Sequence, residues 1–163
     1  MNFKAMVKAA AVVGCLAAGA IPAHADILLT AFTSQAQTWT GVDAKPVFLT
    51  NIANTALPFT NPTAGLVSVT YTAECRLIGG LGTYIHLTIL IDNLVAVPSG
   101  PDAAFCSGRN AAGTAGTGGG FAHQSITVGR VLAAGAHSVK INAQVSSGHT
   151  GARLDNTTLL VVR

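Results

Sequence analysis

Apolar and polar residues alternate one by one along several stretches of the chain, and this period of two is typical of β-strands with one buried face. The clearest stretch is Ser138–Val145, in which Val139, Ile141, Ala143 and Val145 share one parity and polar residues occupy the other. No long stretch after residue 25 repeats its apolar residues with helical spacing. The expected strands are therefore Asp26–Thr33, Pro46–Ile52, Gly65–Cys75, Thr83–Asp92, Gln124–Ala133, Ser138–Val145 and Leu154–Arg163.

Turn residues separate these stretches at intervals of about 8–12 residues, which is typical of β-sandwiches and barrels. Asp92 and Asn93 predict a tight hairpin directly after one strand, and the segment Ser146–Arg153 is expected to link the last two strands. Two longer loops interrupt the spacing: Asn54–Gly65 with its prolines, and the glycine-rich Ser107–Gly120, which its composition predicts to be flexible. We expect an all-β fold, a two-sheet antiparallel sandwich with about eight or nine strands.

The first 25 residues have the three parts of a secretory signal peptide. A basic start precedes the apolar run Ala9–Ile21, and a small-x-small cleavage motif ends at Ala25. We expect cleavage after Ala25, which leaves residues 26–163 as a single domain, secreted or periplasmic, or exposed at the surface of a bacterial cell. The alternative is a lipoprotein signal in which Cys15 would carry the anchor. No later apolar run is long enough for a transmembrane helix.

Charged residues are scarce, because the chain is 50% hydrophobic and 9% charged. Two of its nine basic residues, Lys4 and Lys8, lie in the expected signal peptide, which leaves seven against six acids. These charges are spread along the sequence, whereas a phosphate-binding surface needs concentrated lysine and arginine. We therefore expect no binding to nucleic acid.

Two cysteines, Cys75 and Cys106, remain after removal of the signal peptide. In an oxidising compartment two cysteines most simply form a disulfide bond. The alternative is a metal site made of cysteine and histidine, but such a site favours closely spaced ligands such as C-x-x-C, and that spacing does not occur. We expect the disulfide, no metal and no cofactor.

Histidines and carboxylates are the next candidates for a site. His137 follows Gly135 at the junction of a turn and a strand, and we interpret it as structural. Other histidines could bind a metal if folding brought them together, and two carboxylates facing each other across a cleft could hydrolyse a glycoside. The sequence contains no nucleophile elbow and no phosphate-binding loop. The residues concerned are His86, His123, His149, Asp43, Glu74, Asp92, Asp102 and Asp155.

Trp39 lies in the polar segment Gln35–Asp43, an unusual context for a core tryptophan. Exposed aromatic side chains on a β-sandwich are used to stack against sugars, so Trp39, together with Tyr84 and His86, is a candidate ligand-binding set. The alternative is that Trp39 closes one end of the sandwich as part of the core.

Several of the strand and turn motifs are similar to those of known proteins. Together they resemble small exported bacterial β-sandwich proteins of unassigned activity. The pattern l-x-x-G-x-H-x-V-x-V is similar to one in C1q/TNF-like jelly-roll modules and tail-fibre-like domains. The resemblance covers about residues 67–163; it implies a jelly roll and transfers no catalytic residue. The motifs are Val69–Cys75, Leu87–Asn93, Ala104–Cys106, Ala133–Val145 and Asp155–Val162.

These observations favour a non-enzymatic exported domain with a binding or structural role in the envelope or at the cell surface. The alternatives are a carbohydrate-binding module that uses Trp39, and a small hydrolase whose site has no recognisable motif. The two end strands, Asp26–Thr33 and Leu154–Arg163, carry few of the charges and prolines that guard sheet edges. We therefore expect self-association, with a monomer whose last strand is paired on both sides as the alternative.

Overall fold

The computed structural model describes residues 25–52, 54–79, 82–98, 104–107 and 121–163. The expected signal peptide before Ala25, Cys15, Asp102 and most of the glycine-rich loop lie outside the described residues. The strands are β1 (Ile27–Thr33), β2 (Gln37–Trp39), β3 (Lys45–Pro46), β4 (Ala56–Asn61), β5 (Gly65–Gly79), β6 (Tyr84–Ile91), β7 (Leu94–Val95), β8 (Ala104–Ser107), β9 (Ala122–Leu132), β10 (Gly135–Val145) and β11 (His149–Val162).

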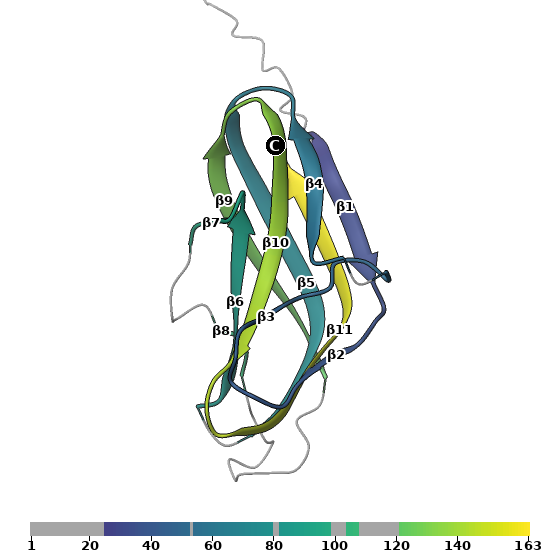
Figure 1. Cartoon of the computed structure of the whole chain (residues 1–163), viewed down its shortest axis with the longest axis vertical. Helices are drawn as coiled ribbons and strands as arrows, with labels where there is room; N and C mark the ends of the chain where they lie inside the picture. The colour runs from purple at the N-terminus through teal and green to yellow at the C-terminus, as the bar shows by residue number, and fades with distance from the viewer. Residues whose placement is uncertain (1–24, 53, 80–81, 99–103, 108–120) are drawn as a thin grey trace, which may run out of the picture.

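The strands form two antiparallel sheets that pack face to face (Figure 1). The first sheet has the order β1-β11-β5-β9, and β2 pairs with the part of β11 that β1 does not reach. In the second sheet β4 and β3 lie on one side of β10, β6 lies on the other, and β7 and β8 flank β6. From β4 to β11 the chain passes repeatedly between the sheets, which gives a jelly roll and confirms the expected two-sheet sandwich.

The alternating sequence explains why these strands pair as two layers. Each long strand turns every second side chain inward, as the buried positions Val67, Val69 and Tyr71 of β5 and Val139 and Ile141 of β10 show. The inward side chains of both sheets make one core. In the described residues there is no helix long and apolar enough to span a membrane.

The predicted strand Pro46–Ile52 was wrong beyond its first residue. Val47 donates its backbone N–H to Ile141, but Leu49 donates to Asn54 and the chain turns there. Both side chains are nevertheless buried, which explains why the segment looked like a strand.

Strand β4 lies inside the segment Asn54–Gly65, which the prolines had marked as a loop. Pro58 is exposed in the middle of β4, opposite Ser138 of β10. β4 pairs only with β10 among the described strands, and an edge strand tolerates a proline because its outer N–H groups have no strand partner.

Two strands extend beyond their predicted limits at the same end of the first sheet. β5 continues past Cys75 to Gly79, and β11 begins at His149, inside the segment expected to be a link. Their pairing runs from His149 opposite Gly79 to Val162 opposite Ser68. This extension creates the part of the sheet on which the candidate site lies.

The predicted hairpin at Asp92 and Asn93 is confirmed. Both residues have positive φ angles, 53° and 64°, and they join β6 to β7. Gly135, at the start of β10, has a φ of 138°, which a residue with a side chain rarely adopts.

A disulfide bond joins Cys75 of β5 to Cys106 of β8, as the sequence predicted. Both cysteines are buried, and the bond connects the first sheet to the second. Two strands in different layers are therefore held together covalently.

The last strand is not an edge. β11 pairs with β5 along one side and with β1 and β2 along the other. The sequence analysis had given a last strand paired on both sides as its alternative. β1 pairs with β11 alone among the described strands, and its side chains Ile27 and Phe32 are 68% and 69% exposed.

Candidate functional site

The structure does not bring Trp39, Tyr84 and His86 together as one ligand-binding surface. Trp39 is 1% exposed and belongs to the core, as the second of the two interpretations of this residue expected, so it is not an exposed stacking platform. Its neighbours Thr38 and Thr40 are exposed on either side of the buried indole, which explains the polar sequence context. Tyr84 and His86 are partly exposed on β6 of the other sheet.

His137 is a structural residue, as expected. Its Nδ1 lies 2.6 Å from a carboxylate oxygen of Asp92, its Nε2 lies 3.0 Å from the carbonyl oxygen of Ala133, and its ring packs against Phe59. The backbone N–H of Ser138 donates to the other oxygen of Asp92. These bonds fix the hairpin after β6 to the start of β10.

The same geometry shifts both pKa values. The hydrogen bond to Asp92, helped by the Ala133 carbonyl and the carboxylate charge, raises the pKa of His137 although partial burial opposes this. Partial burial also opposes ionisation of Asp92, but hydrogen bonds from His137 and Ser138 and the positive charges of His137 and Arg130 outweigh it and lower its pKa.

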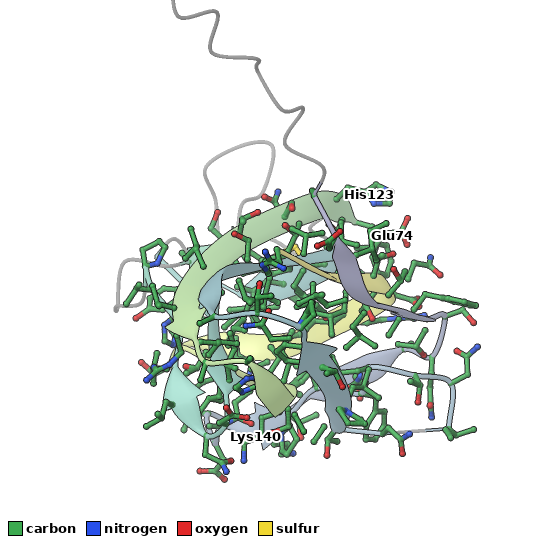
Figure 2. The ribbon with its side chains drawn as sticks, turned by 90° about the horizontal axis from the view of Figure 1, so that it is seen from above. Glu74, His123 and Lys140 are labelled. Carbon is green, nitrogen blue, oxygen red and sulfur yellow. A yellow bond between two sulfur atoms is a disulfide. The ribbon has the colours of Figure 1, made fainter. Side chains whose placement is uncertain are left out.

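The remaining histidines do not converge on a metal site. No group of three or more histidine, cysteine or acidic side chains within the described part of the chain could hold an ion. His149 contacts the carbonyl oxygen of Ser146. His123 lies 3.0 Å from Glu74, on the opposite side of the molecule from Lys140 (Figure 2).

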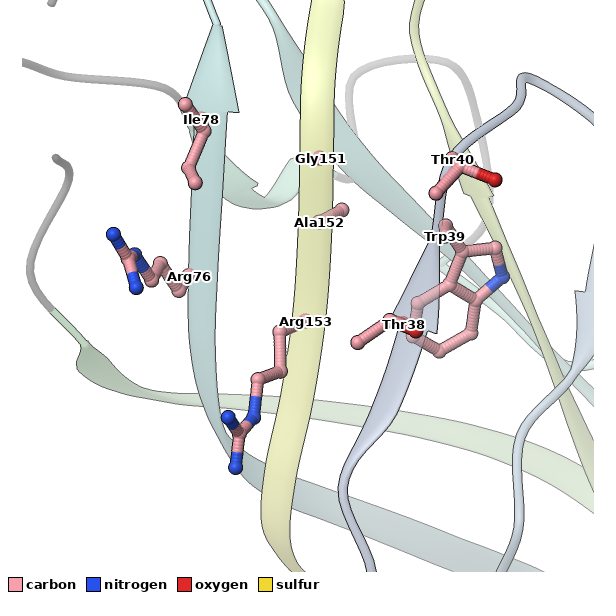
Figure 3. A pocket seen from close by; sticks show the side chains of 8 residues that line it. All are labelled: Thr38, Trp39, Thr40, Arg76, Ile78, Gly151, Ala152 and Arg153. Carbon is pink, nitrogen blue, oxygen red and sulfur yellow. The ribbon is translucent and has the colours of Figure 1, made fainter. Parts of the chain in front are cut away.

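A pocket of about 370 Å³ lies at the extended end of the first sheet, between β2 and β5 and across β11 (Figure 3). We call it the Gly151 pocket. A Cβ atom added at Gly151 would meet no atom within 4 Å, so the missing side chain leaves open space at this position. The pocket is lined by Thr38, Trp39, Thr40, Arg76, Ile78, Gly151, Ala152 and Arg153.

Two arginines stand side by side in this lining. Arg153 of β11 pairs in register with Thr38 of β2 on one side and with Arg76 of β5 on the other, and we call these three residues the arginine row. Both guanidinium groups lie over the ring of Phe121, at 5.4 Å for Arg153 and 5.9 Å for Arg76. The shared ring orients both cations and contributes a modest cation–π attraction.

A row of two acids and a histidine lies next to the arginine row. Asp155 pairs in register with Glu74, and Glu74 pairs with His123 of β9. Asp155 accepts a 2.6 Å bond from Arg153. Glu74 contacts His123 and also accepts a 2.7 Å bond from the side-chain amide of Asn156.

Asn156 owes its position to an irregularity in β11. The register with β5 shifts between Asp155 and Thr158, and Asn156 adopts a φ of 45°. Asparagine tolerates this left-handed conformation better than most residues. The distortion places its side-chain amide at one oxygen of Glu74, while His123 contacts the other oxygen.

The lining of the Gly151 pocket offers groups that can bind a polar ligand. It has guanidinium donors on one wall and threonine hydroxyls on the other, with apolar surface from Ile78 and Ala152. None of the described residues that line it has a carboxylate, an imidazole or a thiol. Glu74 and Asp155 lie one row away as adjacent partners on a sheet surface, an arrangement different from two carboxylates that face each other across a cleft.

The sequence analysis missed these residues because it judged charges by their spread along the chain. A signal was present, since Glu74-Cys75-Arg76 and Arg153-Leu154-Asp155 each place two charges on one face of a strand. The sequence did not show that these two triplets pair with each other, because the partners Arg76 and Arg153 are 77 positions apart in the chain.

No family model matches the sequence, and no curated protein matches it. Among solved structures, dimeric latent PorU from Porphyromonas gingivalis aligns with a TM-score of 0.47 and 9% identity, over 85% of this chain and 13% of that chain. A family 35 carbohydrate-binding module from Clostridium thermocellum aligns with a TM-score of 0.36 and 15% identity, over 84% and 98% of the two chains. A CBM35 from Paenibacillus barcinonensis aligns with a TM-score of 0.30 and 20% identity, over 83% and 97%. Alignments at this level do not indicate what the chain binds.

Proposed function

We propose that residues 26–163 form a non-catalytic binding domain of the bacterial envelope or cell surface, and that the domain binds a saccharide in the Gly151 pocket. In this proposal the Gly151 pocket, and not an exposed Trp39, is the centre of saccharide binding. The predicted signal peptide and the buried disulfide support export, because disulfides persist in oxidising compartments.

The observation that carries the proposal is the composition of the pocket. Thr38 and Thr40 supply hydroxyl groups, Arg76 and Arg153 supply N–H donors, and Ile78 supplies apolar surface around the open space at Gly151. A saccharide needs both kinds of contact, because its ring carries hydroxyl groups at the edge and C–H groups on the faces. The volume falls in the range of small-molecule sites, about 300–1,000 Å³.

The experiment is to fill the pocket without disturbing the sheet. Gly151→Leu places an alkyl side chain in open space at a residue whose φ is not positive, so the variant should fold normally. Binding of the exported chain to a panel of neutral and acidic oligosaccharides should weaken by about tenfold or more, a loss of ~1.4 kcal/mol.

The control is Ala136→Leu, which adds a similar group at an exposed position of β10 in the other sheet. This variant should bind like the unmodified chain. Equal binding by Gly151→Leu and the unmodified chain would show that the pocket is not the site.

We also propose self-association through β1, as a second role. No charged residue and no proline lies within Ile27–Thr33, and Ile27 and Phe32 are exposed on this strand, whose second edge pairs with no other described strand. A second copy could pair edge to edge with this strand. The similarity of the strand pattern to C1q/TNF-like jelly rolls, which often trimerise, is consistent with assembly.

Light scattering of the exported chain at micromolar concentration tests this second role. Phe32→Lys should shift the population toward monomer because an edge lysine opposes strand addition, whereas Ala136→Lys on β10 should leave the population unchanged. A monodisperse monomer of the unmodified chain at every concentration would refute self-association.

A further inference from the structure

We infer that the saccharide bound in the Gly151 pocket is acidic, and that Arg76 binds its anionic group, a carboxylate or a sulfate. The inference rests on the proposed function and specifies its ligand class. It comes from the way in which charges are paired on this part of the first sheet.

The first step is the direct juxtaposition of like charges. Arg153 and Arg76 are register partners, and side chains in such pairs have Cβ atoms about 4.5–5.5 Å apart. Like charges placed directly opposite each other destabilise a sheet. Phe121 is uncharged, so its contact with both guanidinium groups neutralises neither charge.

The second step is that one of the two arginines lacks a counter-ion among the described residues. Arg153 has Asp155 at 2.6 Å. The other nearby acid, Glu74, is engaged by His123 at 3.0 Å and by Asn156 at 2.7 Å. Arg76 contacts the Phe121 ring and bonds no carboxylate within the described part of the chain.

The third step concerns unused hydrogen-bond donors. The Nε atoms of both Arg76 and Arg153 are buried and have no hydrogen-bond partner among the described residues. Leaving a buried charged donor unpaired is costly. An anion at the pocket edge of Arg76 would neutralise the charge that this arrangement leaves without a counter-ion.

The fourth step is the match between guanidinium geometry and the anion. The planar fork of arginine binds carboxylates and sulfate-like groups through two parallel bonds, which lysine cannot do. Because Arg76 lines the same pocket as Thr38 and Thr40, one ligand could meet the guanidinium through its acidic group and the threonines through its hydroxyl groups. A saccharide that carries a carboxylate or a sulfate has both.

The test is calorimetric titration of the exported, disulfide-bonded chain with paired probes. Oligogalacturonate is compared with its methyl ester, which has the same sugar without the charge, and dextran sulfate oligosaccharides are compared with neutral dextran of the same length. The acidic member of a pair should bind at least about tenfold more tightly than its neutral partner, as expected for a charge-assisted contact. The pair that responds tells a carboxylate from a sulfate.

Variants assign the contact to Arg76. Arg76→Gln should weaken binding of the acidic probe by about tenfold to a hundredfold, and Arg76→Lys, which keeps the charge and loses the fork, should weaken it less. Lys140→Gln removes one positive charge from β10 of the second sheet, on the side of the molecule opposite Glu74 (Figure 2), and should bind like the unmodified chain. Circular dichroism of each variant checks that the sandwich is intact.

The outcomes separate the two proposals. Equal binding of acidic and neutral partners, with no effect of Arg76→Gln, overturns the acidic ligand and leaves the saccharide pocket standing. Equal weakening by Arg76→Gln and Lys140→Gln also overturns it, since the attraction would then be to net charge. Binding of no oligosaccharide at all refutes the proposed function, and the inference with it.

Discussion

The outer faces of the two sheets carry very different side chains. On the first sheet Glu74, Arg76, Arg153 and Asp155 occupy two neighbouring rows, in a chain with nine basic and six acidic residues. In the described strands of the second sheet the only lysine, arginine or acidic residues are Lys45 of β3 and Lys140 of β10. The outer face of this sheet is rich in hydroxyl and amide side chains, and neither lysine pairs in register with another charged residue.

This difference shows which face of the sandwich is not arranged for stability alone. On the second sheet, alternating apolar and polar residues give a buried face and an exposed face without any pair of like charges. The first face instead sets arginine opposite arginine and acid opposite acid, which local stability disfavours. Such local conflicts tend to occur at functional sites, and here the conflict borders the Gly151 pocket.

The largest expected effect comes from cutting the bond between the two layers. Replacing Cys75 and Cys106 together by alanine removes the covalent link between β5 and β8. For a loop closed over a sequence separation of 31, the free energy of unfolding should fall by about 3–4 kcal/mol. Urea unfolding of the variant and of the unmodified chain measures it.

The reduced unmodified chain is the matched control for this change. It should approach the stability of the double variant, because both lack the same bond. Equal urea midpoints for the oxidised and reduced chains would mean that the bond between the layers contributes nothing.

A smaller effect should follow from removing one acid of the charged face. Asp155→Asn leaves Arg153 and Arg76 opposite each other without the 2.6 Å bond to Asp155. We expect the free energy of unfolding to fall by about 1 kcal/mol. The same change should tighten binding of an acidic saccharide, since a second guanidinium becomes available.

Lys140→Gln on the other face is the comparison for Asp155→Asn. Surface substitutions of this kind usually change stability by no more than about 0.5 kcal/mol. If the two variants lost stability equally, the outer face of the first sheet would be no more sensitive to the loss of a charge than that of the second.

The smallest expected effect is a pH dependence that arises in the second sheet. Because the pKa of His137 is raised from 6.5, its contribution to stability is fully present below that value and is lost as the pH rises through the raised pKa. Because the pKa of Asp92 is lowered from 3.8, its contribution is present above that value and is lost as the pH falls through the lowered pKa. The pair therefore stabilises the fold most between the two ordinary values.

Thermal unfolding across this range tests the assignment. His137→Gln should lower the melting temperature most between pH 3.8 and 6.5 and progressively less at higher pH. His86→Gln, at a partly exposed position of β6, is the control. A melting-temperature difference between His137→Gln and the unmodified chain that does not vary with pH would exclude the Asp92 pair as its cause.

The sequence predicted the fold better than it predicted the site. Alternation located β5, β6 and β10 because each has a buried and an outward parity over many residues, and it located the hairpin because Asp92 and Asn93 accept positive φ. It missed β4 because a proline is compatible with an edge strand, and edges are known only once the sheet order is known.

The site depended on information that alternation does not carry. The polar neighbours of Trp39 left both an exposed and a core position open for it, and only the structure places the indole in the core. The arginine row exists only through the register of β11 with β2 and β5, which joins segments distant in sequence. A strand pattern fixes the face of each residue and leaves its cross-strand partner open.

The pairing of β1 with β11 sets the order in which the fold can be completed. The backbones of Asp26 and Arg163 exchange two hydrogen bonds, of 2.9 and 3.0 Å, so the first strand closes against the last. A chain that crosses a membrane with its N-terminus first would deliver β1 long before its strand partner β11, since every other described strand lies between them. Until then the apolar stretch Ile27–Thr33 has nothing to pair with, and such long-range closure is slow and prone to aggregation. A circular permutant, in which a short linker joins residue 163 to residue 26 and the chain is opened at another turn, would make β1 and β11 consecutive in sequence. This variant should fold faster.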